Sequence, residues 1–379
     1  MSYSFTLPKW YDLHTHLRQD DLLKPVIQSQ LDMGCCGVLA MPNTKPPVAK
    51  IHAQDPLPYL SLEEYREMIE NAGGDQFTDF ITPLYLTKDT TPEMIEEGAK
   101  SGLLKAVKYY PPHGTTGASF SHPLEKLLKS DVVKALEEHN IVMCVHGEVH
   151  GLEPSQYFDR QTNAEELFYQ DMMPRIIDEF PDLRIVGEHI TTKMAVDLVT
   201  QADDNVKATV TPQHLIYTVG NLLQGLKYHL YCLPLVKFDE DRDALRNAVT
   251  DHNNSKFFAG TDSAPHTKKA TECGCAAGCF TGGVAPQLYA EAFEMSGLDL
   301  SLTDNQMIYQ KFLCDIGQQF YGLEKSGEYF TLTKQETGFD WKAERYGDVV
   351  SLPEGMGRES LSWSLKIEGK DVCAVRKTA

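Results

Sequence analysis

The sequence predicts an α/β protein built as a (β/α)₈ barrel of the TIM type, followed by a C-terminal extension. First, eight strand-like segments alternate with helix-like segments over about the first 320 of 379 residues. Second, most strand segments are continuous apolar runs, which are typical of parallel strands covered on both faces. Third, no Gly-x-Gly-x-x-Gly sequence follows the first strand, which disfavours a doubly wound dinucleotide-binding sheet. The alternation ends near Gly327, so we expect residues 1–326 to form the barrel and residues 327–379 to pack on it.

The expected strands are short and rich in apolar, β-branched and aromatic residues. They cover residues 10–18, 37–41, 77–86, 106–110, 141–146, 183–189, 206–211 and 256–259. The last strand leads directly into Gly260-Thr261-Asp262. Because these strands are expected to run parallel, their C-terminal ends should meet at one end of the barrel, which is where the active sites of this fold lie.

The expected helices are recognised by apolar residues at helical spacing and by their end signals. They cover residues 22–31, 61–73, 123–139, 164–180, 192–202 and 239–252, with a further helix that begins at Thr91. Ser61 and Glu64 form a capping box, and Pro92 stands at the first helical position, where proline is tolerated. Pro174 is expected to kink the helix over residues 164–180.

Composition and charge disfavour two classes of partner. The chain has 35 Lys+Arg against 54 Asp+Glu, a formal charge of −19, whereas a nucleic-acid binder normally carries a basic face. No stretch approaches 18 consecutive apolar residues, and the N-terminus lacks the apolar run of a signal peptide, so we expect no membrane span. The nine cysteines are an odd number in unrelated contexts, which favours a reducing compartment and a cytoplasmic protein.

His14, His16 and Arg18 alternate with Leu13 and Leu17 along the first expected strand. On a strand the two histidines and the arginine would share one face. Two imidazoles about 7 Å apart on one face are able to bind a single metal ion. Because His-x-His pairs also occur by chance on exposed strands, this pair does not establish a metal site by itself.

Polar residues near the ends of the other strands strengthen the metal interpretation. They are Asn43 after the second strand, Lys108 in the fourth, His146 in the fifth, His189 in the sixth, and Asp262 with His266 after the eighth. Five of the eight strands therefore end in a possible metal ligand, which is improbable by chance. An ammonium among bound cations would be repelled, but a buried lysine is able to lose its proton and take up carbon dioxide as a carbamate. From spacing alone, a side chain that extends to solvent is the favoured interpretation of Lys108.

Seven motifs resemble the dihydroorotase family of the amidohydrolase superfamily, in its short monofunctional type. They are His14-Thr-His16-Leu-Arg18, Met41-Pro-Asn43, Ala106-Val-Lys108-Tyr-Tyr-Pro111, Val145-His146-Gly-Glu148, Glu188-His189-Ile-Thr-Thr192, Tyr231-Cys-Leu-Pro234 and Gly260-Thr-Asp262-Ser-Ala-Pro-His266. The resemblance runs in order from about residue 10 to about residue 322, and its last motif is highly specific.

The resemblance implies a binuclear zinc site and a cyclic-amide hydrolase. One zinc ion would be held by His14, His16 and Asp262, the other by His146 and His189, and an N6-carboxylysine at Lys108 would bridge the two. Asp262 would also accept the proton of the nucleophilic hydroxide and pass it to the leaving nitrogen. The implied reaction is the reversible cyclisation of N-carbamoyl-L-aspartate to L-dihydroorotate in pyrimidine (UMP) biosynthesis.

The same resemblance assigns the substrate contacts. Arg18, Asn43 and His266 would hold the substrate carboxylate, while His146, Leu233 and Ala276 would also contact the substrate. The sequence has two alanines between its second and third cysteines in Cys273-Gly-Cys-Ala-Ala-Gly-Cys279, and Ala276 is chosen over Ala277. Thr115 and Thr116 would belong to a lid loop. Glu148 and Glu188 adjoin expected ligands and are expected to orient them.

Other functions stay open at this point. A hydantoinase or allantoinase would share the metals but would not need the carboxylate clamp. A mononuclear deaminase would give Lys108 no role, and a non-catalytic relative would not need the complete ligand set. Cys273, Cys275 and Cys279 lack an evident fourth ligand, so buried thiols are favoured over a metal cluster. The expected partner is a small-molecule substrate, and a homodimer is possible.

Overall fold

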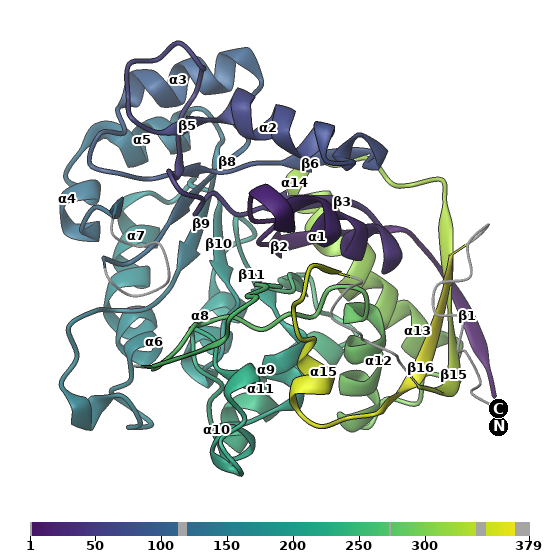
Figure 1. The fold of residues 1–379 in the computed structure, drawn as a ribbon. Helices are drawn as coiled ribbons and strands as arrows, with labels where there is room; N and C mark the ends of the chain where they lie inside the picture. Colours follow the sequence, from purple (N-terminus) through teal and green to yellow (C-terminus); the bar gives the residue numbers. More distant parts are fainter. Residues whose placement is uncertain (1, 113–119, 273, 339–345, 368–379) are drawn as a thin grey trace.

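The computed structural model describes residues 2–112, 120–272, 274–338 and 346–367. Strands and helices alternate along the chain as expected, with the helices arranged around a central group of parallel strands (Figure 1). The central strands are β2 (Trp10–Thr15), β3 (Cys35–Ala40), β6 (Asp79–Ile81), β7 (Leu84–Tyr85), β8 (Ala106–Tyr109), β9 (Val142–His146), β10 (Ile185–Glu188), β11 (Val206–Val210) and β12 (Phe257–Ala259). Short pairs outside this group are β4 (Val48–Lys50) with β5 (Leu60–Ser61), and β13 (Ala270–Thr271) with β14 (Gly274–Cys275).

The helices between the strands follow the expected order with shorter pieces. They are α1 (Asp20–Asp32), α2 (Leu62–Asn71), α3 (Pro92–Ser101), α4 (Leu124–Leu128), α5 (Asp131–Glu138), α6 (Ala164–Leu167), α7 (Met173–Glu179), α8 (Lys193–Gln201), α9 (Pro212–Ile216), α10 (Val219–Leu223) and α11 (Asp239–Thr250). After β12 come α12 (Ala285–Met295), α13 (Thr303–Gln310), α14 (Ile316–Tyr321) and α15 (Leu352–Gly355). The capping box of Ser61 and Glu64 and the position of Pro92 are confirmed.

Two expected helices are interrupted. The segment 123–139 forms α4 and α5, which are separated at Lys129 and Ser130. The segment 164–180 contains a π-helical turn over Phe168–Met172, directly before α7, where Pro174 lies in the first turn. Proline has no amide hydrogen for a helical hydrogen bond, so an irregular turn before it is the expected local response.

The central strands form two parallel sheets. One has the order β12-β11-β10-β9-β8-β7, and the other has the order β2-β3-β6. The single strand expected over residues 77–86 is therefore wrong: its first part pairs with β3 and its second part with β8. Thr82 and Pro83 separate the two parts, and Pro83 has no amide hydrogen to donate to a ladder. The α/β class and the parallel arrangement are confirmed, whereas the described hydrogen bonds do not form a closed barrel.

The two sheets are also joined where β2 lies beside the segment that follows β12. A parallel bridge joins Thr15 to Ser263, and the amide of Asp262 donates to the carbonyl oxygen of His14 at 2.8 Å. The buried carboxylate of Asp12 accepts hydrogen bonds from the Thr261 amide at 2.9 Å and from its hydroxyl at 2.6 Å. These bonds fix the first central strand against the segment that follows the last one.

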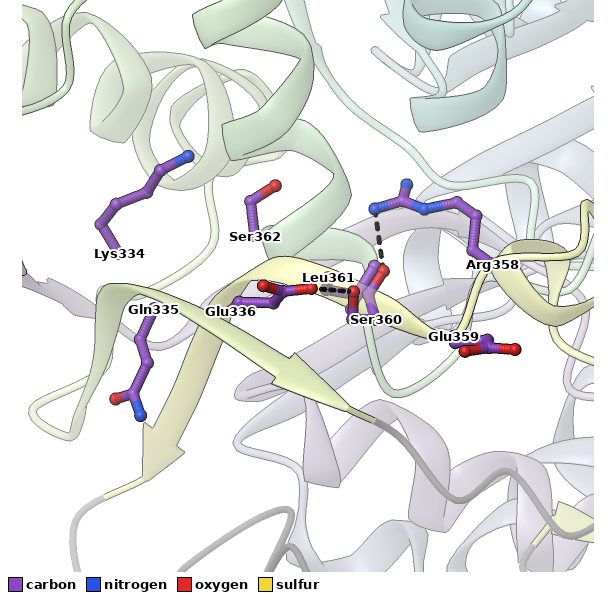
Figure 2. Close-up of a pocket in the computed structure, with 8 residues that line it drawn as sticks. All are labelled: Lys334, Gln335, Glu336, Arg358, Glu359, Ser360, Leu361 and Ser362. Atoms are coloured by element: carbon purple, nitrogen blue, oxygen red, sulfur yellow. Dashed lines mark hydrogen bonds between the residues drawn. The ribbon is translucent and has the colours of Figure 1, made fainter.

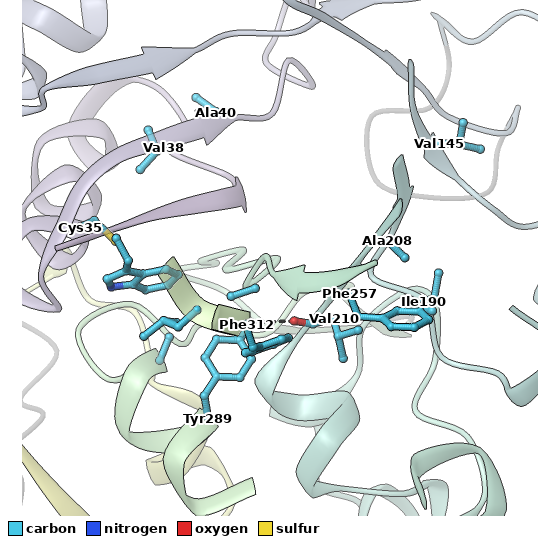
Figure 3. Close-up of a cluster of buried hydrophobic side chains, with 14 of the residues drawn as sticks. Cys35, Val38, Ala40, Val145, Ile190, Ala208, Val210, Phe257, Tyr289 and Phe312 are labelled. Atoms are coloured by element: carbon cyan, nitrogen blue, oxygen red, sulfur yellow. Dashed lines mark hydrogen bonds between the residues drawn. The ribbon is translucent and has the colours of Figure 1, made fainter. Parts of the chain in front are cut away.

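The two faces of the central strands pack into different apolar clusters. On the face toward the helices, Val38, Val145, Val210 and Phe257 join the large cluster shown in Figure 3, where the Tyr289 hydroxyl donates to the Val210 carbonyl oxygen at 2.8 Å. The opposite face forms a smaller interior cluster. Its members include Tyr11, Leu13, Leu39, Ala106, Val142, Cys144, Val186, Phe258 and Tyr321. Lys108 and His146 follow the interior residues Ala106 and Cys144 by two positions, so their side chains point into the interior near the C-terminal ends of β8 and β9.

The C-terminal extension forms a sheet with the N-terminal strand. In this antiparallel sheet β15 (Tyr329–Gly338) lies between β1 (Ser4–Pro8) and β16 (Ser360–Ile367), at one edge of the molecule (Figure 1). Figure 2 shows a polar groove on β15 and β16, where the Ser360 hydroxyl donates to Glu336 at 2.8 Å. β15 begins at Tyr329, and residues 4–8 near the N-terminus belong to the same sheet. In the described part of the chain, no helix is long and apolar enough to span a membrane.

Candidate active site

Three of the expected metal ligands converge at the C-terminal end of the central strands. The Nε2 atom of His16 lies 3.0 Å from Oδ1 of Asp262, and Nε2 of His14 lies 3.5 Å from the same oxygen. One ligand atom from each of the three residues lies within 4.8 Å of the other two, and all three side chains are buried. In the described part of the chain, this is the one group of three or more His, Cys, Asp or Glu side chains with metal-ligand spacing.

His146, His189 and Lys108 lie next to this group. The ring centroid of His189 is 4.8 Å from that of His14 and 4.7 Å from that of His146. Lys108 is fully buried in β8, and its amine has no hydrogen-bond partner in the described structure. A side chain that extends to solvent, the interpretation favoured by spacing alone, is therefore wrong for Lys108. An orphaned buried amine is costly, so this position favours a modified or metal-linked lysine.

In each of three histidines, one ring nitrogen is hydrogen-bonded to a neighbouring side chain, so the other nitrogen is available for a metal ion. His14 uses Nδ1 with Glu188 at 2.6 Å, and His16 uses Nδ1 with Asn43 at 2.7 Å. His146 uses Nε2 with Glu148 at 2.7 Å. Such outer partners are typical of metal-bound histidines, because they fix the tautomer and the orientation of the ring. The donor set, imidazole nitrogen with carboxylate oxygen, fits zinc.

Three site residues have a left-handed backbone that only glycine adopts readily. The φ angles are +66° at Arg18, +42° at His189 and +47° at Asp262. Each residue follows the last residue of a strand by one to three positions, so the expected strand 10–18 ends early, at Thr15. A strained backbone at a strand end, held by surrounding structure, is characteristic of functional sites. The turns redirect side chains that a continued strand would place elsewhere.

Burial favours the neutral forms of His16 and His189. It lowers the pKa of His16 to about 4 and lowers the pKa of His189 well below its ordinary value. Burial opposes ionisation of Asp262, but its contacts with His16 and His14 outweigh burial and hold the pKa of Asp262 at about 2. Burial also lowers the pKa of the Lys108 amine. Neutral imidazoles beside an ionised carboxylate are the protonation states that bind a metal ion.

Arg18 lines the same pocket as the histidines, and His266 lies in contact with Arg18 but is not among the lining residues. The Arg18 Nε atom donates to the Pro265 carbonyl oxygen at 3.1 Å, and its Nη2 atom lies 3.3 Å from Nε2 of His266. The His266 Nε2 atom lies 2.8 Å from the carbonyl oxygen of Ala277. Burial, together with the Arg18 charge, lowers the pKa of His266 to about 4. This corner therefore offers a guanidinium for an anionic group without a competing carboxylate in contact with it.

One pocket collects most of the sites expected from the sequence. It is lined by His14, His16, Arg18, Asn43, Tyr110, His146, His189, Leu233, Asp262, Ala264, Ala277 and Gly278. Ala276 is not among these residues, and its amide donates instead to the Lys269 carbonyl oxygen at 2.8 Å. The alanine that faces the pocket is therefore Ala277, the alternative that was not chosen. The expected lid residues Thr115 and Thr116 lie outside the described residues, as does Cys273.

The sequence interpretation missed Tyr110 and the wall formed by residues 264, 277 and 278. Tyr110 follows Lys108 by two positions, so the period of a strand already placed it on the same face. The sequence carried no comparable signal for Ala264 and Gly278, because alanine and glycine have no ligand or catalytic group in their side chains. Cys275 is half-buried and Cys279 is buried, and neither belongs to a metal-ligand group among the described residues.

Comparisons with known proteins place the chain among cyclic-amide hydrolases. No family model matches the chain. A dihydroorotase of Halorhodospira halophila is 38% identical over 369 residues, which cover 96% of this chain and 99% of that protein. The crystal structure of a Saccharomyces cerevisiae dihydroorotase in complex with 5-fluoroorotic acid has a TM-score of 0.82 and 25% identity, and covers 97% of this chain and 99% of that one. An L-hydantoinase of Arthrobacter aurescens, with a TM-score of 0.75, 16% identity and coverage of 97% and 85%, shares the fold alone.

Proposed function

The chain belongs to the dihydroorotase family, and from this premise we propose that it interconverts L-dihydroorotate and N-carbamoyl-L-aspartate. In one direction water opens the cyclic amide, and in the other the ring closes with loss of water, which is the direction of pyrimidine biosynthesis. The observation that supports this function most directly is a pocket lined by the His14–His16–Asp262 ligand group and by Arg18, which is in contact with His266. A metal centre beside a carboxylate-binding corner matches a cyclic amide that carries a carboxylate.

The residues present fit two zinc ions. His14, His16 and Asp262 would hold one, and His146 with His189 would hold the other, with a carboxylated Lys108 between them. When bound, zinc supplies a hydroxide nucleophile near neutral pH and polarises the amide carbonyl. The support from this chain is the unpartnered Lys108 amine and the inward-facing ring nitrogens.

The remaining roles belong to side chains of the pocket. Asp262, ionised at neutral pH, would accept a proton and pass it to the leaving ring nitrogen. Arg18, Asn43 and His266 would bind the substrate carboxylate, and backbone groups of Leu233 and Ala277, rather than Ala276, would meet the ring. Thr115 and Thr116 are proposed to act from a lid loop, which lies outside the described residues.

We infer a (β/α)₈ arrangement if β6 and β7 are counted as one interrupted strand. The central strands then number eight, and the bridge from Thr15 to Ser263 brings the first beside the last. Active-site residues at the C-terminal ends of the strands are what this arrangement predicts. The division into a barrel (1–326) and an extension (327–379), a homodimer and a cytoplasmic location stay predictions.

An assay with two substrate classes tests the proposed function. Purified zinc-loaded protein should open dihydroorotate, followed by ultraviolet absorbance, and should open unsubstituted hydantoin or allantoin far more slowly. The reason is that only dihydroorotate carries the carboxylate that Arg18 and His266 would bind. Equal or faster turnover of hydantoin would favour the hydantoinase alternative. A zinc count on the same sample separates a metal-free preparation from an inactive protein.

A further inference from the structure

Tyr110 lines the pocket, and its hydroxyl group has no hydrogen-bond partner in the described structure. The side chain is 2% exposed and lines the pocket together with the expected metal ligands. Its oxygen is buried and unpaired in the described structure. Buried hydroxyl groups are nearly always hydrogen-bonded, because an unpaired one loses its bonds to water without compensation. Because Tyr110 lines the pocket, a molecule bound there is able to supply the missing partner.

The aromatic ring of Tyr110 is held in place by packing on its other sides. The Tyr85 ring lies 4.9 Å away between centroids, and the Tyr85 hydroxyl is itself bonded to the Ser121 hydroxyl at 2.7 Å. The ring centroid of His146 is 6.4 Å from that of Tyr110, and the Lys108 nitrogen is 5.1 Å from the Tyr110 centroid. A hydroxyl on a ring packed in this way has a fixed direction, which suits a specific ligand contact.

We propose that the Tyr110 hydroxyl forms a hydrogen bond with the ring of the bound cyclic ureide and thereby contributes to substrate affinity. This inference rests on the proposed function and adds a substrate contact to it. Dihydroorotate has a carboxylate, two ring carbonyl groups and two ring N–H groups. Arg18 and His266 would take the carboxylate, and the metal-ligand group would take the carbonyl that is attacked. The polar edge that is left has a carbonyl and N–H groups, and a hydroxyl is able to pair with either kind.

The chain offers a matched control in Tyr169. Its hydroxyl is also buried and unpaired in the described structure, and its side chain is 1% exposed. Tyr169 does not line the pocket; its ring packs against Gly147 and Gly187 instead. Tyr110→Phe and Tyr169→Phe therefore remove the same atom from the same kind of environment, and they differ in access to a ligand.

The test compares the two variants with the wild type as zinc-loaded full-length proteins. Without ligand, both variants should keep or raise the melting temperature, because each loses an unpaired polar group. Tyr110→Phe should raise KM for dihydroorotate about tenfold with kcat within about threefold, as expected when one ligand hydrogen bond is lost. Orotate has the same carbonyl and N–H groups on its ring. The rise in melting temperature that orotate causes should be smaller in Tyr110→Phe than in the wild type and unchanged in Tyr169→Phe.

Three results would overturn the contact. An unchanged KM and an unchanged orotate shift in Tyr110→Phe would mean that the hydroxyl is idle. A lower melting temperature without ligand would mean that it has a partner in the protein. A fall in kcat at unchanged KM would exclude a role in substrate affinity. If the wild type neither opens dihydroorotate nor binds orotate, the proposed function fails and this contact fails with it.

Discussion

The Nδ1 atom of His14 lies 2.6 Å from Oε2 of Glu188, and the Thr209 hydroxyl donates to the same oxygen at 2.7 Å. Both His14 and Glu188 are about 1% exposed, so water does not weaken this pair. Burial alone would raise the pKa of Glu188, but His14 and Lys108 outweigh it and keep the pKa below its usual value. Glu188 therefore favours the anionic form and fixes the tautomer of His14, a proposed metal ligand.

Glu188→Ala should weaken zinc binding about 10- to 100-fold, which is the usual effect of removing such an outer partner. The reason is that the His14 ring loses the acceptor that directs its other nitrogen inward. Competition with a chelator, followed by a zinc count, measures the change. The exposed Glu179→Gln serves as a control and should bind zinc as the wild type does. Equal zinc retention in both variants would remove Glu188 from the metal site.

Arg18→Met should raise KM for dihydroorotate about 100-fold while both metals stay bound. A charged hydrogen bond to a carboxylate contributes about 1.5 to 3 kcal/mol, which corresponds to a change of this size. Arg18 contacts Pro265 and His266 but no metal-ligand candidate by a hydrogen bond in the described structure, so zinc content should not change. Steady-state kinetics and a zinc count on the same sample provide the measurement. A KM equal to that of the wild type would contradict the carboxylate clamp.

Much of this site could be predicted from the sequence because parallel strands place their C-terminal ends together. Once His14, Lys108, His146 and Asp262 were assigned to strand ends, their proximity followed from the fold class and needed no tertiary information. Strand alternation also predicts the interior direction of Lys108 and His146, which follow the interior residues Ala106 and Cys144 by two positions. It does not depend on the boundaries of each strand to within a residue.

The features that could not be predicted depend on tertiary contacts. The choice between Ala276 and Ala277 depends on the turn after β14, where the Ala276 amide bonds to Lys269 and leaves Ala277 toward the pocket. The division of the strand over 77–86 depends on which neighbour each half reaches. Burial of Lys108 depends on the interior packing, and spacing alone therefore gave the wrong answer for its side chain.

Glu166 is expected to make the stability of the protein depend on pH. Burial, together with nearby Asp241 and Glu165, raises the pKa of Glu166 to about 7. A carboxyl with a higher pKa in the folded chain binds protons more tightly when folded, so the free energy of unfolding falls as the pH rises from its ordinary pKa toward 7. Glu166→Gln removes this pH-dependent fall in the free energy of unfolding, because glutamine does not titrate. From about pH 5 to about pH 8, the free energy of unfolding of the variant should rise by about 1 kcal/mol relative to that of the wild type. This figure allows for partial solvent screening.

Urea unfolding at the two pH values measures this difference. Glu179→Gln, an exposed substitution, should shift the free energy of unfolding by the same amount at both. For each variant, the free energy of unfolding is compared with that of the wild type. The prediction is wrong if this difference is the same at both pH values for Glu166→Gln. The comparison of differences cancels the contributions of titrating groups that do not interact with Glu166, since these are shared by the variant and the wild type.

Lys108→Ala should lose zinc together with activity, because we expect the lysine and the metals to stabilise each other. The Lys108 amine is buried beside His146, His189 and Asp262 without a hydrogen-bond partner in the described structure. As an ammonium it would repel two dications, whereas a carbamate would add negative charge and two oxygen ligands. Removal of the amine therefore removes a bridge rather than an isolated charge. Added acetate or propionate should restore part of the zinc content and part of the turnover, because a free carboxylate is able to occupy the space of the carbamate. A Lys108→Ala protein with two tightly bound zinc ions and normal turnover would contradict the bridge, and so would a zinc-loaded wild type whose lysine is unmodified.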